Sequence, residues 1–133
     1  MTLAAVAFLL LLPGVLYVLA VLRVDGQPKP ADPSAYDPKT LMLAWTRCGE
    51  TSSFSIQPLN PWIIAGRFIF GDARSQRPGE LAAWQIARAH NVAHQVGSNF
   101  WWHLSGASLT VWITRQWSAE QIAATIESEG LCT

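Results

Sequence analysis

The chain has 133 residues, a length that permits a single domain, and nine Lys and Arg side chains balance nine Asp and Glu. This neutral balance argues against nucleic-acid binding, which needs a basic face to neutralise phosphates. Every charged side chain lies at or after Arg23, so the beginning of the chain is uncharged.

An uncharged apolar stretch occupies residues 3–22. As a helix rising about 1.5 Å per residue it would span about 30 Å, the thickness of a bilayer core. Pro13 and Gly14 are tolerated in such a helix. A cleavable signal peptide would have basic residues ahead of a shorter apolar stretch of roughly 7–15 residues. The sequence therefore favours an uncleaved transmembrane anchor over residues 1–24.

Two signals disagree about the orientation of this anchor. Arg23, Lys29 and Lys39 all follow it, and the positive-inside rule would then hold the domain in the cytoplasm. Cys48 and Cys132 lie near the two ends of the folded part, where one disulfide would close the domain and would suit an oxidising compartment. Two unpaired buried thiols are the alternative. The residues by themselves leave the orientation open.

A proline-rich segment separates the anchor from the domain. Four of the eight prolines lie within residues 26–38, which show no apolar periodicity. This composition predicts a stiff, extended tether over residues 25–39 that lifts the domain off the membrane. The remaining residues, 40–133, are expected to form one small domain.

The first two segments of that domain are ambiguous. Residues 41–57 mix short apolar runs with turn residues, which fits a strand or a brief helix. Asn60 and Pro61 form a helix-start signal before an apolar stretch that reaches Phe70. Glycines in this stretch weaken the helix prediction, so a buried strand is the alternative.

Three helices are predicted in the remainder. Within residues 78–97 apolar side chains recur at steps of three and four, which predicts one buried helix face. That face consists of Ala82, Ile86, Ala89, Ala93 and Val96. A second helix is expected over residues 100–117. A third begins at Ser118, which can form a capping box with Gln121, and ends at Gly130. The predicted fold class is mostly α.

Asp72 is the first candidate for chemistry. It follows an apolar run and is itself followed by Arg74 and Arg77. A carboxylate at the edge of an apolar segment can have its pKa raised by desolvation and act as a general base. The alternative is a structural carboxylate paired with a nearby arginine at the end of a helix.

The histidines and tryptophans are weaker candidates. His90 and His94 would share a helix face, but no carboxylate or cysteine stands at ligand spacing around them, so no metal site is expected. Four tryptophans could face a glycan or a lipid, or could pack in the core. They are Trp101, Trp102, Trp112 and Trp117. The usual phosphate-loop, dinucleotide and nucleophile motifs are missing.

Three segments resemble peptidoglycan glycosyltransferases. Residues 108–128, SLTVWITRQWSAEQIAATIES, resemble the segment in which a long helix ends, a Trp-Ser or Leu-Ser junction follows, and the next helix begins. Residues 77–90, RPGELAAWQIARAH, resemble the family's Q-Q motif, with Gln85, Ala87 and Arg88 in place. Residues 60–74 resemble the start of the catalytic region and put Asp72 at the position of the catalytic glutamate. The anchor resembles that of the monofunctional members.

The resemblance implies a small lysozyme-like helical domain on the periplasmic side of the inner membrane. Asp72 would be the base that deprotonates the 4-hydroxyl of the acceptor sugar, and a lipid-linked pyrophosphate would leave. Gln85, Arg88 and Arg77 would bind the pyrophosphate or the glycan. The implied partners are the membrane and lipid-linked disaccharide or peptidoglycan, with no nucleic acid. No cofactor is implied, except for a divalent metal at the pyrophosphate if the domain is active.

The chain departs from the family pattern in ways that leave activity open. The family's Glu-Asp pair becomes Asp72 and Ala73, and the shorter acid moves the base by about one methylene, an error of about 1 Å that can cost on the order of a hundredfold in rate. The family's basic pair and second glutamate fall on Trp102, His103 and Gly106. The alternative function is therefore a non-catalytic envelope protein that binds glycan or assembles with a cell-wall or secretion complex. A helix-turn-helix DNA-binding module would need basic residues after residue 118, and there are none.

Overall fold

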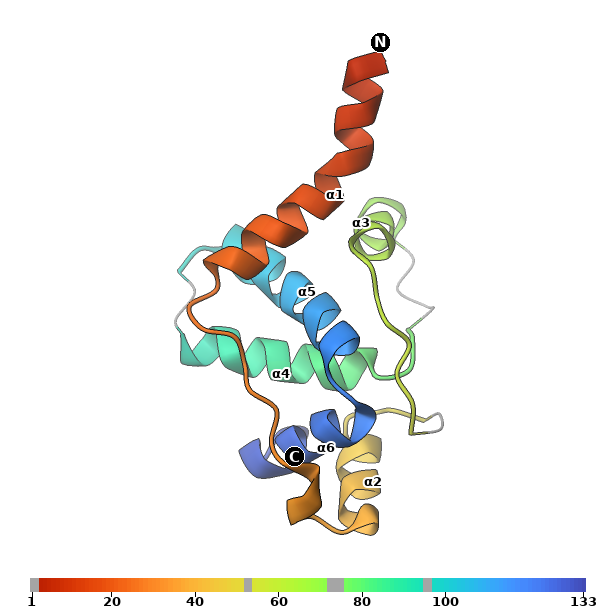
Figure 1. The fold of residues 1–133 in the computed structure, drawn as a ribbon, viewed down its shortest axis with the longest axis vertical. Helices are drawn as coiled ribbons and strands as arrows, with labels where there is room; N and C mark the ends of the chain where they lie inside the picture. The colour runs from red at the N-terminus through yellow and green to blue at the C-terminus, as the bar shows by residue number, and fades with distance from the viewer. Residues whose placement is uncertain (1–2, 52–53, 72–75, 95–96) are drawn as a thin grey trace.

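The computed structural model describes residues 3–51, 54–71, 76–94 and 97–133, and throughout these ranges the regular structure is helical (Figure 1). The elements in chain order are α1 (Leu3–Arg23), η1 (Pro33–Ala35), α2 (Pro38–Arg47), α3 (Pro61–Phe70), α4 (Glu80–Ala93), α5 (Asn99–Gln116) and α6 (Ala119–Glu129). The predicted mostly α fold is confirmed. Among the described residues, α1 is the one helix long and apolar enough to cross a membrane.

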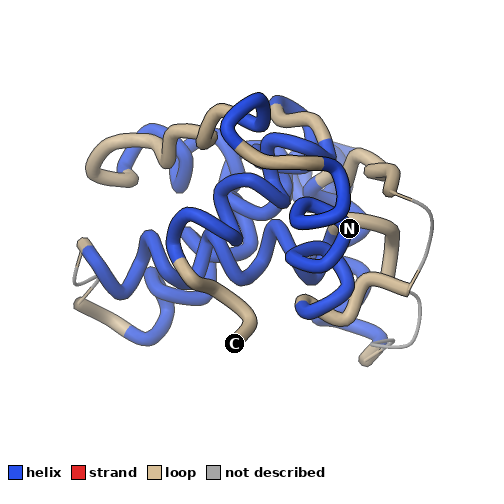
Figure 2. Tube along the Cα trace, turned by 90° about the horizontal axis from the view of Figure 1, so that it is seen from below, coloured by secondary structure: helices blue, strands red, loops and turns tan. Residues whose placement is uncertain are grey.

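The core lies between α4, α5, α6 and α2. Seen from below, the helices are grouped closely together and joined by loops (Figure 2). The largest fully buried side chains of the core include Trp45, Ile86, Leu109, Ile113 and Ile122. Burial of side chains of this size stabilises a fold by about 1.5–3 kcal/mol each. Helices from the N-terminal and the C-terminal part of the domain therefore share one hydrophobic core.

Each ambiguous segment contains a helix that begins with a strong local cap, although in residues 41–57 the helix ends at Arg47. The Asp37 side chain accepts hydrogen bonds from the backbone N–H groups of Lys39 and Thr40 at the start of α2. The Asn60 side chain accepts one from Ile63 N at the start of α3, 2.9 Å away. In both helices proline occupies the first turn, where its missing N–H costs nothing. The strand alternative for residues 60–70 is wrong.

The α4 helix differs from the prediction in its length and in its buried face. It ends at Ala93, which is exposed, and Val96 lies outside the described residues. The buried residues are Ala82, Ala83, Ile86, Ala87 and Asn91. Gly106 of α5 explains the rotation, because a Cβ there would come within 3.0 Å of the Trp84 ring. A glycine on α5 lets the Trp84 ring lie against that helix, a contact that the apolar spacing of α4 does not reveal.

The junction of α5 and α6 forms as its local pattern predicts. The Ser118 side chain accepts from Gln121 N, and the Gln121 side chain accepts from Ser118 N, which completes the capping box. Trp117, the residue before the cap, is buried and contacts Trp112 with ring centroids 6.1 Å apart. The tryptophan therefore packs the corner between the two helices.

The first helix is docked on the domain. Figure 1 shows α1 projecting from one end, bending near its middle, and then lying over α5 with α3 beside it. Pro13 lies inside the helix, and Ala20 in its second half is only 1% exposed. The Trp62 indole of α3 donates a hydrogen bond to the Leu10 carbonyl. The second half of α1 is thus part of the folded unit.

The proline-rich segment does not hold the domain away from α1. It runs along the side of the domain, where Ala31 N donates a 2.9 Å hydrogen bond to the Thr125 hydroxyl of α6. Val24 and Tyr36 pack against the core from either end of the segment. Because these contacts fix the segment to α6, residues 25–39 pack along the domain and do not act as a spacer.

Candidate functional site

An apolar cavity of about 360 Å³ lies between α1, α3 and α5. Its walls include Pro13, Leu16 and Tyr17 of α1, Ile64 of α3 and Leu104 of α5. A volume of this size is within the range of small-molecule sites. Since one wall is the helix that is apolar enough to enter a membrane, the cavity suits a hydrocarbon chain.

A second cavity of about 410 Å³ lies between α3, α4 and α5; most of its lining is apolar, and we call it the polar cavity after the polar side chains that reach it. Its polar groups come from Arg67, Gln76, Glu80 and Thr110, and the Trp84 ring supplies an aromatic face.

Two residues line both cavities. Ile64 of α3 and Ala107 of α5 belong to the apolar cavity on one side and to the polar cavity on the other. The two spaces are therefore neighbours with a shared wall. An apolar space beside a polar one matches an amphiphile whose tail and head group have different chemistry.

An ion pair forms part of the polar cavity. Arg67 in the last turn of α3 donates from Nη1 to one carboxylate oxygen of Glu80, and both side chains are mostly buried. The other oxygen accepts from Arg77 N at 3.0 Å. Glu80 is the first residue of α4, where the helix dipole also favours a negative charge. The wall thus offers charged hydrogen-bonding groups without a large net charge.

The predicted catalytic acid, Asp72, lies outside the described residues. The residue before it, Gly71, ends α3 in a left-handed conformation and lines the polar cavity.

The predicted substrate-binding residues do not gather around the cavities. Arg88 is exposed and Gln85 half-buried on α4, and neither lines the apolar or the polar cavity. Arg77 is half-buried, and its backbone N–H donates to Glu80 at the site. Sequence reasoning missed Arg67, although a lone arginine inside an apolar run was a signal that it has a buried partner.

A third cavity, of about 460 Å³, lies where the end of α1 meets α4 and α5. His90 and His94 stack there with ring centroids 4.0 Å apart, beside Arg23 and Asp25. Burial lowers the pKa of His90, and the neighbouring His94 lowers it further, while the backbone of Gly26 and Asp25 opposes the shift. Among the described residues, no three His, Cys, Asp or Glu side chains are grouped as metal ligands.

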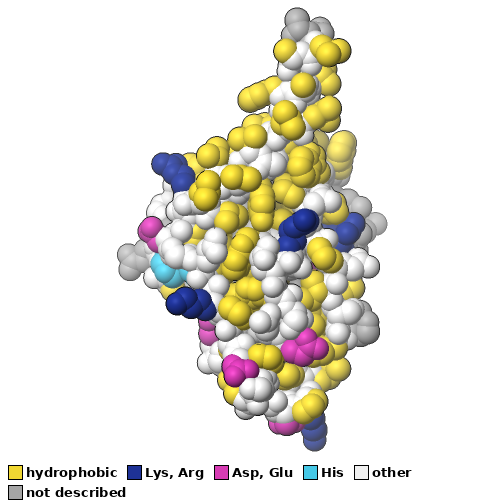
Figure 3. Space-filling view, viewed as in Figure 1, with side chains coloured by type: hydrophobic (Ala, Val, Ile, Leu, Met, Phe, Trp, Pro, Cys, Tyr) yellow, Lys and Arg dark blue, Asp and Glu magenta, His cyan; other side chains and the backbone are white. Residues whose placement is uncertain are grey.

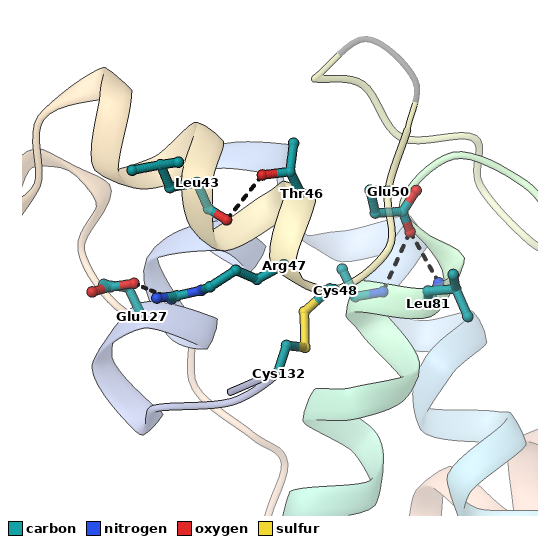
Figure 4. Close-up of a disulfide and its surroundings, with 9 residues drawn as sticks. Leu43, Thr46, Arg47, Cys48, Glu50, Leu81, Glu127 and Cys132 are labelled. Atoms are coloured by element: carbon teal, nitrogen blue, oxygen red, sulfur yellow. Dashed lines mark hydrogen bonds and ion pairs between the residues drawn. A yellow bond between two sulfur atoms is a disulfide. The ribbon is translucent and has the colours of Figure 1, made fainter.

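The two cysteines form a disulfide that joins the end of α2 to the C-terminal segment (Figure 4). Beside it, Arg47 of α2 pairs with Glu127 of α6. The buried Glu50 carboxylate accepts from the backbone N–H groups at the start of α4, including Leu81 N at 3.0 Å. This end of the molecule is a structural clasp of three helices. The disulfide pairing is the one that the sequence analysis expected for Cys48 and Cys132.

The tryptophans are mainly packing residues. Trp84 and Trp102 meet edge to face across α4 and α5, with centroids 6.0 Å apart. Trp101 lies under the Arg23 guanidinium, whose carbon is 5.0 Å from the ring centroid. Trp117 is buried, so of the four tryptophans that the sequence analysis singled out it is the one that packs fully in the core.

No protein-family model matches this chain, and comparisons with curated proteins and with solved structures give no match. By its fold, the described part of this protein is a small helical domain packed against one helix that is apolar enough to cross a membrane. The resemblance to peptidoglycan glycosyltransferases rests on sequence motifs.

Proposed function

We propose that this chain is a single-pass protein of the inner membrane whose periplasmic domain binds a lipid-linked saccharide. The observation that carries the proposal is the shared wall of Ile64 and Ala107 between an apolar and a polar cavity. The lipid chain would enter the apolar cavity beside α1, and the saccharide would occupy the polar cavity. The resemblance to peptidoglycan glycosyltransferases points to the same chemical class of ligand.

The lipid chain has a direct route to its cavity. Pro13, Leu16 and Tyr17 lie in the second half of the proposed anchor, so the cavity opens beside a helix that contacts lipid. A lipid chain that enters from the bilayer is already out of water, so it gains little hydrophobic free energy on entering the cavity. Its contribution is van der Waals packing against the cavity walls, which a soluble sugar without such a chain lacks.

The saccharide has donors, acceptors and an aromatic face in the polar cavity. Arg67 supplies N–H donors, and Glu80 and Gln76 supply acceptors around the space. The Trp84 ring can lie against the apolar face of a sugar. The exposed Arg88 is not part of this cavity, so the proposal assigns binding here to Arg67 in its place.

Glycosyl transfer is the second candidate function, and Gly71 favours it. This glycine lines the polar cavity and directly precedes Asp72. As the base, Asp72 would take the proton of the acceptor 4-hydroxyl, whose oxygen would attack the anomeric carbon while the lipid pyrophosphate leaves. Neither Gln85 nor Arg88 lines either cavity, and this favours binding without polymerisation.

The disulfide supports the periplasmic placement, since such bonds persist in oxidising compartments. Alkaline phosphatase fused to the C-terminus would be active only if the domain is exported. An inactive, well-expressed fusion would put the domain in the cytoplasm and remove the periplasmic part of the proposal.

Binding is tested with the full chain in lipid nanodiscs and a fluorescent lipid-linked disaccharide. Replacement of the shared wall, Ala107→Phe, should fill both cavities and weaken binding at least tenfold. The control is Ala93→Phe, at an exposed position on α4, which should bind like the wild type. Thermal unfolding of both variants checks that they are folded. Absence of binding by the wild type, or equal binding by a folded Ala107→Phe, would contradict the proposal.

The same preparation separates binding from polymerisation. Gel analysis of the labelled disaccharide should show bound monomer and no glycan chains. Chains that disappear in Asp72→Asn would instead establish the second candidate, with Asp72 as the base.

A further inference from the structure

Only the first half of α1 is free to cross a membrane in the docked structure. Residues 3–12 precede the proline, and ten helical residues extend about 15 Å, half of the bilayer core of about 30 Å. The second half contacts the domain, with Ala20 buried, and near the end of the first half the Leu10 carbonyl already accepts a hydrogen bond from Trp62. A full crossing by α1 would therefore carry part of the domain into the bilayer.

The part that would be carried in is apolar on its outer surface. Ile69 and Phe70 at the end of α3 are 74% and 82% exposed, and Phe100 at the start of α5 is also exposed. The outward side of α1 after Pro13 is apolar as well, through Val15, Val18, Leu19 and Leu22. We call this set of exposed apolar side chains the leaflet face. It consists of the side chains of α1 named above, of Trp62, Ile69 and Phe70 on α3, and of Phe100 on α5. On the side seen in Figure 3, apolar side chains cover the projecting end and charged ones begin below it.

Several polar groups of α3 are paired within the protein, as a hydrocarbon environment requires. Asn60 caps the first turn, and Gly71 N donates to the Arg67 carbonyl at the last turn. The Arg67 charge is matched by Glu80, and the Trp62 indole N–H by the Leu10 carbonyl. Nothing in these contacts requires water.

We propose that the leaflet face sits among the acyl chains of one leaflet, so that α3 lies in the membrane and the domain is partly embedded. This inference rests on the proposed membrane anchoring and goes beyond it, because an anchor by itself would leave α3 in water. The occupant of the face is lipid, because α1 carries no charge from Leu3 to Leu22 and α3 lies against it through the bond between Trp62 and Leu10. Arg23, which lies over Trp101, marks the head-group level, where arginine and tryptophan are favoured.

The chain offers a clean labelling experiment. Its two cysteines are joined in a disulfide, so one introduced cysteine is the single reactive thiol. We would prepare Phe70→Cys for α3, Leu9→Cys for the free half of α1 and Leu43→Cys for α2. Leu43 is 53% exposed on α2, the helix at the end of the molecule away from the N-terminus (Figure 1), which makes it the matched control. Each protein carries a fluorophore and is reconstituted in liposomes.

Two quenchers report the surroundings of each label. Lipids brominated on the acyl chains should quench the labels at positions 70 and 9 at least threefold more than the label at 43. Iodide in the water should quench the label at 43 at least threefold more than the other two. Iodide quenching at 70 equal to that at 43, with the label at 9 still quenched by lipid, would overturn the inference and leave the anchoring intact.

Three other outcomes of the quenching experiment also test the inference. A label at position 70 that neither quencher reaches would mean that protein, such as a second copy, covers the face, and this overturns the lipid assignment. Iodide quenching at both 9 and 70 would overturn the anchoring together with the inference. Lipid quenching at 70 from bromines near the head groups alone would support the inference and set the depth of α3.

Discussion

The Trp62 indole nitrogen lies 2.7 Å from the Leu10 carbonyl oxygen and donates a hydrogen bond to it. Leu10 is in the turn before Pro13, whose missing N–H leaves the carbonyl of the neighbouring Leu9 without its helical donor. Gly14 completes the contact, because a Cβ at that position would come within 3.1 Å of the Trp62 ring. A side chain of α3 thus contacts α1 beside its proline, and this joins the potential membrane helix to the domain.

Trp62→Phe should weaken the contact between α1 and the domain. The substitution keeps most of the aromatic surface and removes the N–H, so we expect a loss of about 1 kcal/mol of stability. Thermal unfolding in nanodiscs measures it. Trp112→Phe, near the α5–α6 corner, is the control for the loss of an indole elsewhere. An unchanged melting temperature for Trp62→Phe would show that the bond contributes nothing to docking of α1.

Gly106→Ala should destabilise the core. The added Cβ would lie 3.0 Å from the Trp84 ring, so the ring or the helix must move, at a cost of about 1–3 kcal/mol. Gly66→Ala in α3 is the matched control, because a Cβ there meets nothing within 4 Å. Since alanine favours helix over glycine by about 1 kcal/mol, the control should be neutral or stabilising. Chemical denaturation of both variants tests the pair, and equal stabilities would contradict the close α4–α5 contact.

Loss of the disulfide should cost about 4 kcal/mol, because the bond closes a loop between residues 84 apart. Urea unfolding of the protein before and after reduction measures the difference. Mass spectrometry after alkylation without reductant should find neither Cys48 nor Cys132 modified. Modification of both thiols in the natively purified protein would remove the main argument for an oxidising compartment.

Acidification should destabilise the region around His90, where the end of α1 meets α4 and α5. Burial lowers the pKa of this imidazole in the folded chain, so the folded state binds a proton less readily than the unfolded state. The stability that the neutral ring contributes is fully present above the unfolded pKa of about 6.5 and is lost as the pH falls through the lower folded pKa. His94, Arg23 and Asp25 line the same cavity.

The measurement is the free energy of unfolding between pH 7.5 and pH 5 in the wild type and in His90→Gln. The wild type should lose stability over this range, and the variant should lose less. His103→Gln, at an exposed position on α5, should behave like the wild type. Identical pH profiles for His90→Gln and the wild type would show that His90 does not cause the loss.

Local patterns explain which predictions of structure succeeded. The caps at Asn60 and Ser118 act within one turn of their own helix, so their effect can be read from neighbouring residues. The α4 face was mispredicted after Ile86 because alanines offer similar apolar surface on several sides, and the Trp84 contact with α5 decided the rotation.

The candidate site was much less predictable. Arg67 and Glu80 are 13 residues apart and lie on different helices, so no short motif contains both. The residues that a family motif singled out on α4, Gln85 and Arg88, share a helix but line neither cavity.

The sequence by itself determined the three helices after residue 78, the uncharged stretch of α1 and a cysteine pair able to close the domain, because spacing, caps and composition are local. The tertiary structure decided where these elements meet. It joined Trp62 to Leu10 across 52 positions and Ala31 to Thr125 across 94. These contacts turned an expected anchor and tether into parts of the folded domain, since burial and hydrogen bonding depend on which surfaces meet and not on order in the chain.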